Sequence, residues 1–261
     1  MKFTKKSLGQ NFLIDQNIIR KITNLTKINN RNIIEIGPGE GALTNEIIKN
    51  NPKSLSLIEK DSELVKRLKS KYSEVKFINI YHDDILDFDL QKLNKKDSVI
   101  FGNLPYNISS QILIKILKFN EWPPKFKDII FMFQKEVGEK IYSKFPSSKY
   151  GRLSIITKYR LNIVKKFFVS PNCFFPKPKI NSVVIHFIPK IQKYYKIKNL
   201  KNLEEITNIF FSNKRKMINK NIKKILNKNE IKELKNLDTT CRPSELKPEI
   251  FYKITELFEK N

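Results

Sequence analysis

One short turn holds the residue types best suited to chemistry in this 261-residue chain: Gly102-Asn103-Leu104-Pro105-Tyr106. An aromatic amine such as N6 of adenine is a poor nucleophile because its lone pair is conjugated into the ring. If the side-chain oxygen of Asn103 and a neighbouring backbone carbonyl accept its two N–H bonds, the nitrogen can turn its lone pair toward an electrophilic methyl group. Such catalysis works by positioning the reactants and by placing acceptors where positive charge develops.

Two further residues of this turn complete the expected binding site for the amine. Pro105 fixes its own φ and so holds the direction of the carbonyl, and Tyr106 offers a face on which a base can stack. The expected catalytic residues of the turn are Asn103, Leu104, Pro105 and Tyr106. The alternative is an ordinary β-turn, in which Asn and Pro are common.

A glycine-rich segment, Glu35-Ile36-Gly37-Pro38-Gly39-Glu40-Gly41, follows a predicted strand over 32–36 and precedes a predicted helix over 43–50. Glycines at this place let the backbone approach a ligand, and Glu59, at the end of the next strand, can accept hydrogen bonds from both hydroxyls of a ribose. The pair fits NAD as well as S-adenosylmethionine. However, the G-x-G-x-G spacing lacks the third glycine of the dinucleotide fingerprint G-x-G-x-x-G. A tight turn with a surface carboxylate is the alternative.

A polar turn with two aspartates follows the third predicted strand. Asp84 could accept a hydrogen bond from the exocyclic amine of an adenine, while the backbone N–H of Ile85 donates to a ring nitrogen. Asp83 is adjacent and could be confused with it, but Asp84 directly precedes the apolar Ile85. Either aspartate could instead be a helix N-cap or a turn residue.

The elements that must position these residues alternate along the chain. Strands are predicted over 32–36, 54–59, 75–80, 97–101 and 129–133, with helices over 43–50, 61–71 and 109–117 and from Lys135 onward. This order predicts an α/β fold with a parallel, doubly wound sheet. Segments 163–169 and 182–188 alternate like an antiparallel pair, and the chain after Pro189 reads as helical. The expected domains are therefore residues 1–189 and residues 190–261.

The charge distribution indicates a polyanionic partner. The chain has 51 basic and 26 acidic residues, a net charge of +25, and residues 140–203 contain 15 basic side chains and no acidic one. A one-signed field of this kind suits a nucleic acid bound through its phosphates. Biased codon usage, solubility or an anionic membrane surface are alternatives.

Other function classes are disfavoured by composition. The longest apolar run, 129–133, is far shorter than a membrane span needs. Two cysteines far apart and two histidines predict neither a disulfide framework nor a metal site, which fits a reducing cytosol.

Several motifs together carry a family resemblance. They are Leu8-Gly9-Gln10-Asn11-Phe12-Leu13, Glu35 through Gly39, Phe101 through Tyr106, Gln134-Lys135-Glu136-Val137, Tyr150-Gly151-Arg152-Leu153-Ser154, Phe174 through Ser182 and Asn213-Lys214-Arg215-Lys216. Over nearly its whole length the chain resembles the bacterial small-subunit ribosomal RNA adenine N6,N6-dimethyltransferases. It departs at Lys214, where the family often has Arg, and at Asn181, where it often has Asp.

The resemblance implies a Rossmann-like S-adenosylmethionine-dependent methyltransferase sheet with a small, all-helical C-terminal domain that binds RNA. It implies dimethylation of N6 of two adjacent adenosines in a hairpin loop near the 3′ end of 16S rRNA, with a role in small-subunit biogenesis. The implied partners are this rRNA and a partly assembled 30S particle, with a monomeric, cytoplasmic enzyme, no membrane and no metal.

The resemblance also assigns roles to single residues. It implies that Gln10, Asn11 and Leu13 close over the cofactor as a lid. Gly37 and Gly39 would lie at the methionine end of the cofactor, Glu59 would bind its ribose, and Asp84 and Ile85 would bind its adenine. Asn103 would lie at the reaction centre. Phe174 is expected to take the face of the target base opposite Tyr106. That phenylalanine, in a proline-braced loop among lysines, could instead be a core residue.

Three rival functions remain open on the sequence. A sister enzyme could methylate a large-subunit adenosine, which the Asn103 turn does not exclude. A ribosome-assembly or transcription factor could bind RNA without turnover, but it would have no use for Glu59, Asp84 and Asn103 together. An NAD-dependent dehydrogenase is disfavoured by the glycine spacing and by the lack of an acid–base residue near the loop.

Overall fold

The chain forms two compact units in a computed structural model that describes residues 11–191, 194–234 and 237–260. The first unit comprises Met1–Gly138 and Asn162–Pro189, and the second comprises Glu139–Leu161 and Lys190–Asn261. The sequence-based limits of 1–189 and 190–261 differ from these units because they place 139–161 in the first domain. This segment contains helix α6 (Arg152–Arg160), whose packing partners come from later in the chain. The acid-free segment 140–203 begins close to this boundary, but it continues through β7 and β9 of the first unit and so does not separate the two units.

A seven-stranded sheet forms the centre of the first unit, with the order β4-β3-β2-β5-β6-β9-β7. Its strands are β2 (Asn32–Ile36), β3 (Ser54–Glu59), β4 (Ile78–His82), β5 (Val99–Asn103), β6 (Asp128–Gln134), β7 (Leu161–Val169) and β9 (Ser182–Pro189). The strands from β4 to β6 pair in parallel, and β9 pairs antiparallel to β6. The predicted α/β, Rossmann-like class is confirmed.

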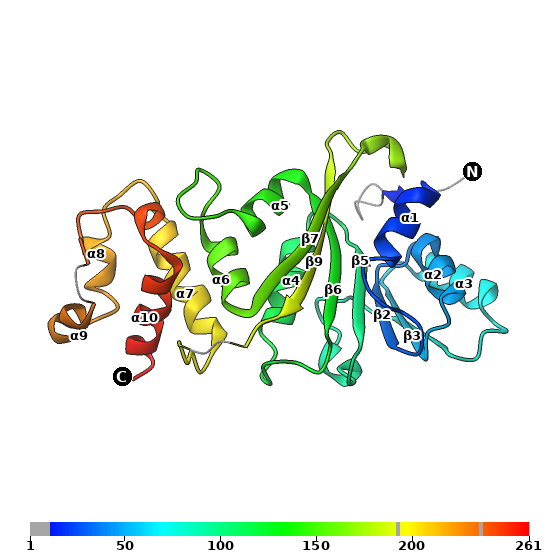
Figure 1. Ribbon diagram of the computed structural model, residues 1–261, viewed down its shortest axis with the longest axis horizontal. Coiled ribbons are helices and arrows are strands. Elements are labelled where there is room, and N and C mark those ends of the chain that lie inside the picture. Colours follow the sequence, from blue (N-terminus) through cyan, green and yellow to red (C-terminus); the bar gives the residue numbers. More distant parts are fainter. Residues whose placement is uncertain (1–10, 192–193, 235–236, 261) are drawn as a thin grey trace. The chain divides into compact units, whose positions relative to one another are not determined.

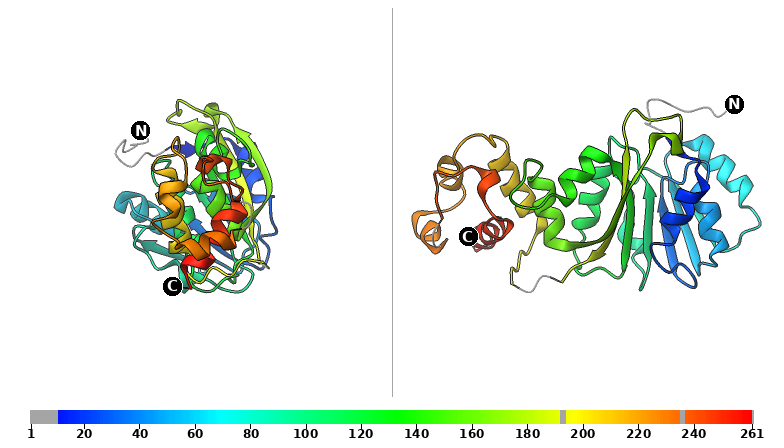
Figure 2. Two further views of the ribbon diagram at one scale, coloured as in Figure 1. Left: turned by 90° about the vertical axis from the view of Figure 1, so that its left-hand side faces the viewer. Right: turned by 45° about the horizontal axis from the view of Figure 1, so that its top comes forward.

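Helices cover both faces of this sheet, which is why its central strands are almost wholly apolar. Helices α2 (Ala42–Lys49) and α3 (Ser62–Lys71) lie on one face and α4 (Ser109–Leu117) on the other (Figure 1). The second view of Figure 2 shows the same layers from another side. Helix α1 (Gln16–Thr23) packs with α2, and helix α5 (Lys135–Tyr142) follows β6 directly. In α1, the Asp15 carboxylate caps the first turn by accepting from the N–H groups of Asn17 and Ile18.

Two strands begin later than their apolar patterns predict. Residues 75–77, expected in the strand 75–80, form a turn in which the N–H of Ile78 donates to Val75, so β4 begins at Ile78. Asp97 has a φ of +60°, which ends the loop before β5 and moves that strand from 97–101 to Val99–Asn103. Gly102 and Asn103, which were expected in the turn after the strand, are therefore the last two residues of β5.

A second, two-stranded sheet was not predicted. Strand β1 (Phe12–Leu13) pairs antiparallel with β8 (Phe174–Phe175), and the register sets Phe12 opposite Phe175 and Leu13 opposite Phe174. A short 3-10 helix, Pro171–Cys173, leads into β8, and the Ile14 N–H donates to the Cys173 carbonyl. This small sheet ties the start of the described chain to the loop before β9.

Helices build the second unit. They are α6, α7 (Leu200–Phe211), α8 (Asn219–Ile222), α9 (Lys228–Glu233) and α10 (Pro248–Phe258). Aromatic rings fill the space between α7 and α10, with Phe210 and Phe251 centred 5.6 Å apart. Tyr252 of α10 donates its hydroxyl to the Ile155 carbonyl of α6. None of the helices that the structure describes has the length and apolar composition needed to cross a bilayer.

A buried polar cluster joins the amino ends of the strands in the first unit. The Asp128 carboxylate accepts hydrogen bonds from Thr26, Arg31 and His186 at 2.9, 2.8 and 2.7 Å. Arg31 also donates to the Asp97 carbonyl at 2.6 Å. One carboxylate thus holds together the segment after α1 and the strands β6 and β9, at the edge of the sheet away from the loops described below.

Replacing Asp128 with Ala should destabilise the protein by about 3 kcal/mol, because it leaves the buried guanidinium of Arg31 without its carboxylate. Urea denaturation would measure the free energy of unfolding. The matched control is Lys127→Ala, which removes an exposed ion pair with Asp97 and should cost less than about 1 kcal/mol. Equal losses in the two variants would contradict a structural role for the cluster.

Candidate active site

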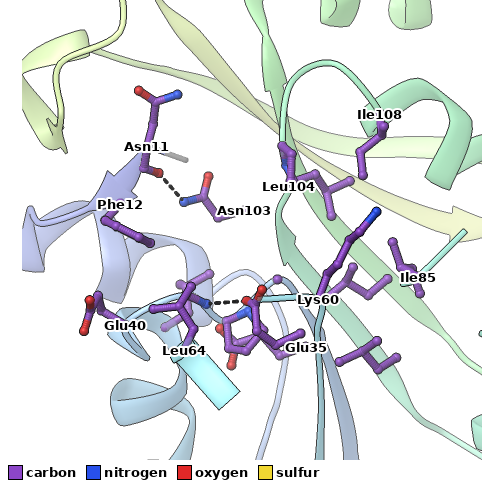
Figure 3. Close-up of a pocket in the computed structure, with 18 of the residues that line it drawn as sticks. Asn11, Phe12, Glu35, Glu40, Lys60, Leu64, Ile85, Asn103, Leu104 and Ile108 are labelled. Atoms are coloured by element: carbon purple, nitrogen blue, oxygen red, sulfur yellow. Dashed lines mark hydrogen bonds between the residues drawn. The ribbon is translucent and has the colours of Figure 1, made fainter. Parts of the chain in front are cut away.

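A cavity of about 250 Å³ opens where β2, β3 and β5 end. Figure 3 shows its wall, to which residues from several separate segments contribute. Parallel strands end at the same edge of a sheet, so residues far apart in sequence meet there. The lining includes Asn11, Phe12, Leu13, Glu35, Gly37, Gly39, Glu59, Lys60, Asp83, Asp84, Ile85, Asn103, Leu104, Pro105 and Tyr106.

The glycine loop between β2 and α2 forms one wall of the cavity. Gly37 and Gly39 have φ values of +66° and +59°, which residues that carry a Cβ atom disfavour. A Cβ on Gly39 would lie 2.9 Å from two ring atoms of Phe12. The loop therefore packs directly against the aromatic ring of β1, and a larger residue would push that ring away.

Glu59 ends β3 beside this loop and is only 8% exposed. Its two carboxylate oxygens accept from the N–H groups of Gly39 at 3.2 Å and of Asp61 at 2.9 Å. Burial raises the pKa of this carboxyl above its usual value, although these backbone hydrogen bonds oppose the shift. A carboxylate has about four acceptor positions, so these bonds leave room for a hydrogen bond from a ligand hydroxyl, such as one of a ribose.

Asp84 lies in the loop after β4, where it is already engaged. One oxygen pairs with the ammonium of Lys60 at 2.6 Å, and the other accepts from the N–H of Leu86 at 2.9 Å. The hydrogen bond from Lys60 lowers the pKa of Asp84, which keeps it an acceptor at neutral pH. Asp84 thus stabilises its own turn and also lines the cavity, so its position is compatible with binding a ligand as well. Asp83 lines the cavity beside it.

Asn103 reaches the cavity from the end of β5. Its Nδ2 donates to the backbone carbonyl of Asn11 at 3.1 Å, and Figure 3 shows the side chain turned toward that carbonyl. A carbonyl can only accept, so this bond fixes which way the amide faces and leaves Oδ1 pointing away from Asn11. The segment before β1 thereby orients the residue expected at the reaction centre.

Tyr106 is held from the opposite side. Its hydroxyl lies 2.6 Å from Oγ of Ser182, a buried residue that begins β9. Burial raises the pKa of the phenol, so it stays neutral near pH 7. The Ser182 contact restrains the ring of Tyr106 and joins this corner to the loop that follows β8.

Glu35 is the most buried acid of the cavity, at 1% exposure. Its Oε2 accepts from the Thr44 hydroxyl at 2.7 Å. Burial raises its pKa to about 7, and the nearby Glu59 carboxylate adds to the shift. The carboxyl is thus poised between its neutral and charged forms under ordinary conditions.

The charge of the lining is opposite to that of the chain. Its charged members are one basic residue, Lys60, and five acidic ones, Glu35, Glu40, Glu59, Asp83 and Asp84. S-adenosylmethionine carries a sulfonium and an ammonium against one carboxylate, so its net charge is positive, whereas NAD brings an anionic pyrophosphate. The donor set, together with the glycines that leave space for a ligand, fits S-adenosylmethionine and disfavours a dinucleotide.

Most residues expected at the site from the sequence line the same cavity. They are Asn11, Leu13, Gly37, Gly39, Glu59, Asp84, Ile85, Asn103, Leu104, Pro105 and Tyr106. Gln10 lies outside the described residues. Phe174 does not line the cavity: it is 3% exposed and packs in the core with Leu13, as the core-residue alternative proposed.

Residues of the site that were not anticipated as part of it include Phe12, Glu35, Lys60 and Ser182. A signal existed for Glu35, because an acid inside the apolar strand 32–36 is unusual. Lys60 and Ser182 carried no such signal, since their roles depend on partners distant in sequence.

Comparison with known families gives a match over almost the whole chain. The family model described as "Ribosomal RNA adenine dimethylase" matches residues 1–260. A protein of Pelagibacter ubique (strain HTCC1062) named "Ribosomal RNA small subunit methyltransferase A" is 45% identical over 260 residues, covering 98% of this chain and 97% of its own. A protein of the same name from Malacoplasma penetrans (strain HF-2) is 40% identical over 257 residues, covering 97% and 91%.

A solved structure agrees with this match. The crystal structure of a dimethyladenosine transferase from Plasmodium falciparum is similar with a TM-score of 0.80 and 27% identity, covering 95% of this chain and 98% of the other. The similarity therefore extends through both units and is not confined to the α/β sheet.

The pKa of Glu35 predicts how stability depends on pH. The folded-state value of about 7 exceeds the ordinary value of 4.5, so the folded chain holds this proton more tightly than the unfolded chain. The contribution of Glu35 to stability is therefore full below about pH 4.5 and is lost as pH rises to about 7, by up to about 3 kcal/mol. Glu35→Gln cannot titrate, so its stability relative to wild type should rise between pH 5 and pH 8, as measured by urea unfolding.

The control is Glu63→Gln, which changes an exposed carboxylate on α3. Its free energy of unfolding relative to wild type should stay nearly constant over the same range. A constant difference for Glu35→Gln would show that this carboxyl is ionised in the fold throughout.

Proposed function

The chain belongs to the ribosomal RNA adenine dimethylase family, and we propose that it methylates N6 of two adjacent adenosines in a hairpin loop near the 3′ end of small-subunit (16S) rRNA. It is an S-adenosylmethionine-dependent rRNA adenine dimethyltransferase. The two relatives at 40% and 45% identity, both named for the small subunit, support the choice of that rRNA.

The orientation of Asn103 carries the assignment of the site. With Nδ2 donating to the Asn11 carbonyl, Oδ1 is the amide atom that can accept an N–H bond from a substrate amine. We assign the second acceptor to the Leu104 carbonyl, because those of Pro105 and Tyr106 already accept from Ile108 and Ser109. The pyrrolidine ring of Pro105 restrains the peptide that bears this carbonyl.

S-adenosylmethionine, when bound, supplies a methyl group on a positively charged sulfur. We propose that Glu59 holds its ribose hydroxyls, that Asp84 and the Ile85 N–H bind its adenine, and that Gly37 and Gly39 let its methionine end approach the backbone. Asn11 and Leu13 close the cavity from the start of the chain. Each of these residues lies on a loop or strand end of one sheet edge, so their spacing is set by the sheet.

The corner needs no strong base. The amine nitrogen gains positive charge as its new bond to carbon forms, and the two oxygens placed on its N–H bonds stabilise that charge. The proton becomes acidic after transfer and can leave to solvent. Two successive methyl transfers are needed for dimethylation, and Asn103 is neutral in both. The singly methylated amine therefore meets the same side chains as the free amine, but it has one N–H group fewer to donate.

The proposed substrate particle is rRNA in a partly assembled 30S subunit, bound by a monomer in the cytoplasm. Exposed basic residues support contact with RNA phosphates. In the second unit they include Lys214, Arg215, Lys216, Lys220, Lys223, Lys224 and Lys228. Lys220 lies in α8 and Lys228 begins α9, and the others lie on the turns before and after α8.

Calorimetric titration should show binding of S-adenosylmethionine and none of NAD at the same concentrations, because the acidic lining repels a pyrophosphate. Gly39→Ala should weaken binding of S-adenosylmethionine about 10-fold or more, since its Cβ displaces the Phe12 ring at an unfavourable φ. Gly151→Ala is the matched control, because a Cβ there meets Phe211 only at an ordinary 3.6 Å. Tight binding of NAD would reject the cofactor assignment.

Asn103→Ala should lower the rate of methyl transfer at least about 100-fold while leaving the affinities for S-adenosylmethionine and RNA within a few-fold of wild type. Transfer of labelled methyl groups to unmethylated 30S particles measures the rate, and primer extension locates the modified nucleotides. Near-wild-type rates in the variant would remove Asn103 from the reaction centre. Stops on large-subunit rRNA would instead identify a large-subunit enzyme.

A further inference from the structure

The register of the small sheet separates two neighbouring phenylalanines onto opposite faces. Residues directly opposite each other in an antiparallel pair point to the same side. Leu13 and Phe174 form one such pair, and both are buried in the core of the first unit. Phe12 and Phe175 form the other, on the face that Phe12 turns toward the glycine loop.

Phe175 is the exposed member of that second pair. It is 49% exposed, whereas Phe12 lies beneath at 8% and lines the cavity. The ring of Phe175 is thus open to a ligand, on the same face of the small sheet as a residue that lines the cavity. The following loop also leads to Ser182, whose hydroxyl contacts Tyr106, so each end of the segment 175–182 adjoins a residue that lines the cavity.

The surroundings of Phe175 are positively charged. Lys177 and Lys179 lie on the loop that follows β8, and both are exposed. The whole segment 140–203 contains no acidic residue. An exposed aromatic ring among lysines is suited to an unpaired nucleotide, which offers a base to stack and phosphates to neutralise.

We infer that Phe175 is a stacking platform for the base of a nucleotide adjacent to the target adenosine, with Lys177 and Lys179 contacting its flanking phosphates. The inference rests on the proposed function, because it takes the substrate to be a single-stranded RNA loop at this cavity. It places Phe175 outside the cofactor cavity and gives it a role in holding the neighbour of the methylated base. Phe174, on the buried face, then supports this small sheet from below.

A double-mutant cycle on RNA affinity tests this inference. The RNA is a hairpin with two adjacent adenosines in its loop, and a second set of hairpins carries an abasic site at each flanking loop position in turn. Phe175→Ala should weaken binding of the intact hairpin about 10-fold, as measured by fluorescence anisotropy. If Phe175 stacks on one flanking base, the variant should lose almost nothing further on the hairpin that lacks that base.

Several controls make the outcome specific. Phe175→Tyr and Phe175→Trp keep a stacking face and should bind RNA as wild type does. Tyr194→Ala removes a more exposed aromatic ring of the second unit, at 84% exposure, and should show no coupling to either flanking base. Affinity for S-adenosylmethionine should be unchanged in Phe175→Ala.

The inference fails if the losses of RNA affinity caused by Phe175→Ala and by each abasic site are additive. It also fails if Phe175→Ala lowers the affinity for S-adenosylmethionine instead, because Phe175 would then only support Phe12. These outcomes are binding affinities, which can be measured whether or not the RNA is methylated. Loss of the proposed function would appear separately, as wild-type enzyme that transfers no methyl group to small-subunit rRNA.

Discussion

The parallel pairing of β2, β3 and β5 is the constraint on which the site depends. In-register pairing sets Ile36 beside Ile58 and Gly102, so the residues that follow these three strands emerge together. The glycine loop, Glu59 and Asn103 thereby share one cavity, although the sequence separates them widely. Apolar residues on both faces of these strands make any slip in register costly, because it would expose part of the core between two layers of helices.

A second consequence is a separation of charge within a strongly basic chain. The cavity concentrates acidic groups, while the loops and turns outside it carry exposed lysines. A cationic methyl donor and a polyanionic RNA can then bind the same protein without competing for one surface. The buried Glu35 limits this arrangement, since burial raises its pKa to about 7 and part of the negative charge of the lining depends on pH.

Local patterns were sufficient to predict much of the fold and of the cavity. A few neighbouring residues were enough to predict the strands 32–36 and 54–59, the glycine loop and the acidic residues at the ends of the strands. The shifts of β4 and β5 arose where a turn competed with an apolar run or where Asp97 adopts a positive φ. Contacts between distant segments could not be predicted from local patterns, because they depend on tertiary structure. Examples are the β1–β8 register, the contact of Tyr106 with Ser182 and the packing of α6 in the second unit.

The same distant pairings orient the neutral side chains to which we assign the proposed reaction. Asn103 could present either end of its amide to a substrate, and the Asn11 carbonyl resolves that choice. Tyr106 could rotate about its side-chain bonds, and Ser182 restrains it. In the reaction we propose, positioning supplies most of the effect, so we expect these two contacts to influence the rate without touching the reacting atoms. They come from the residue before β1 and from the start of β9, so this side of the cavity is shaped by segments that meet only in the folded chain.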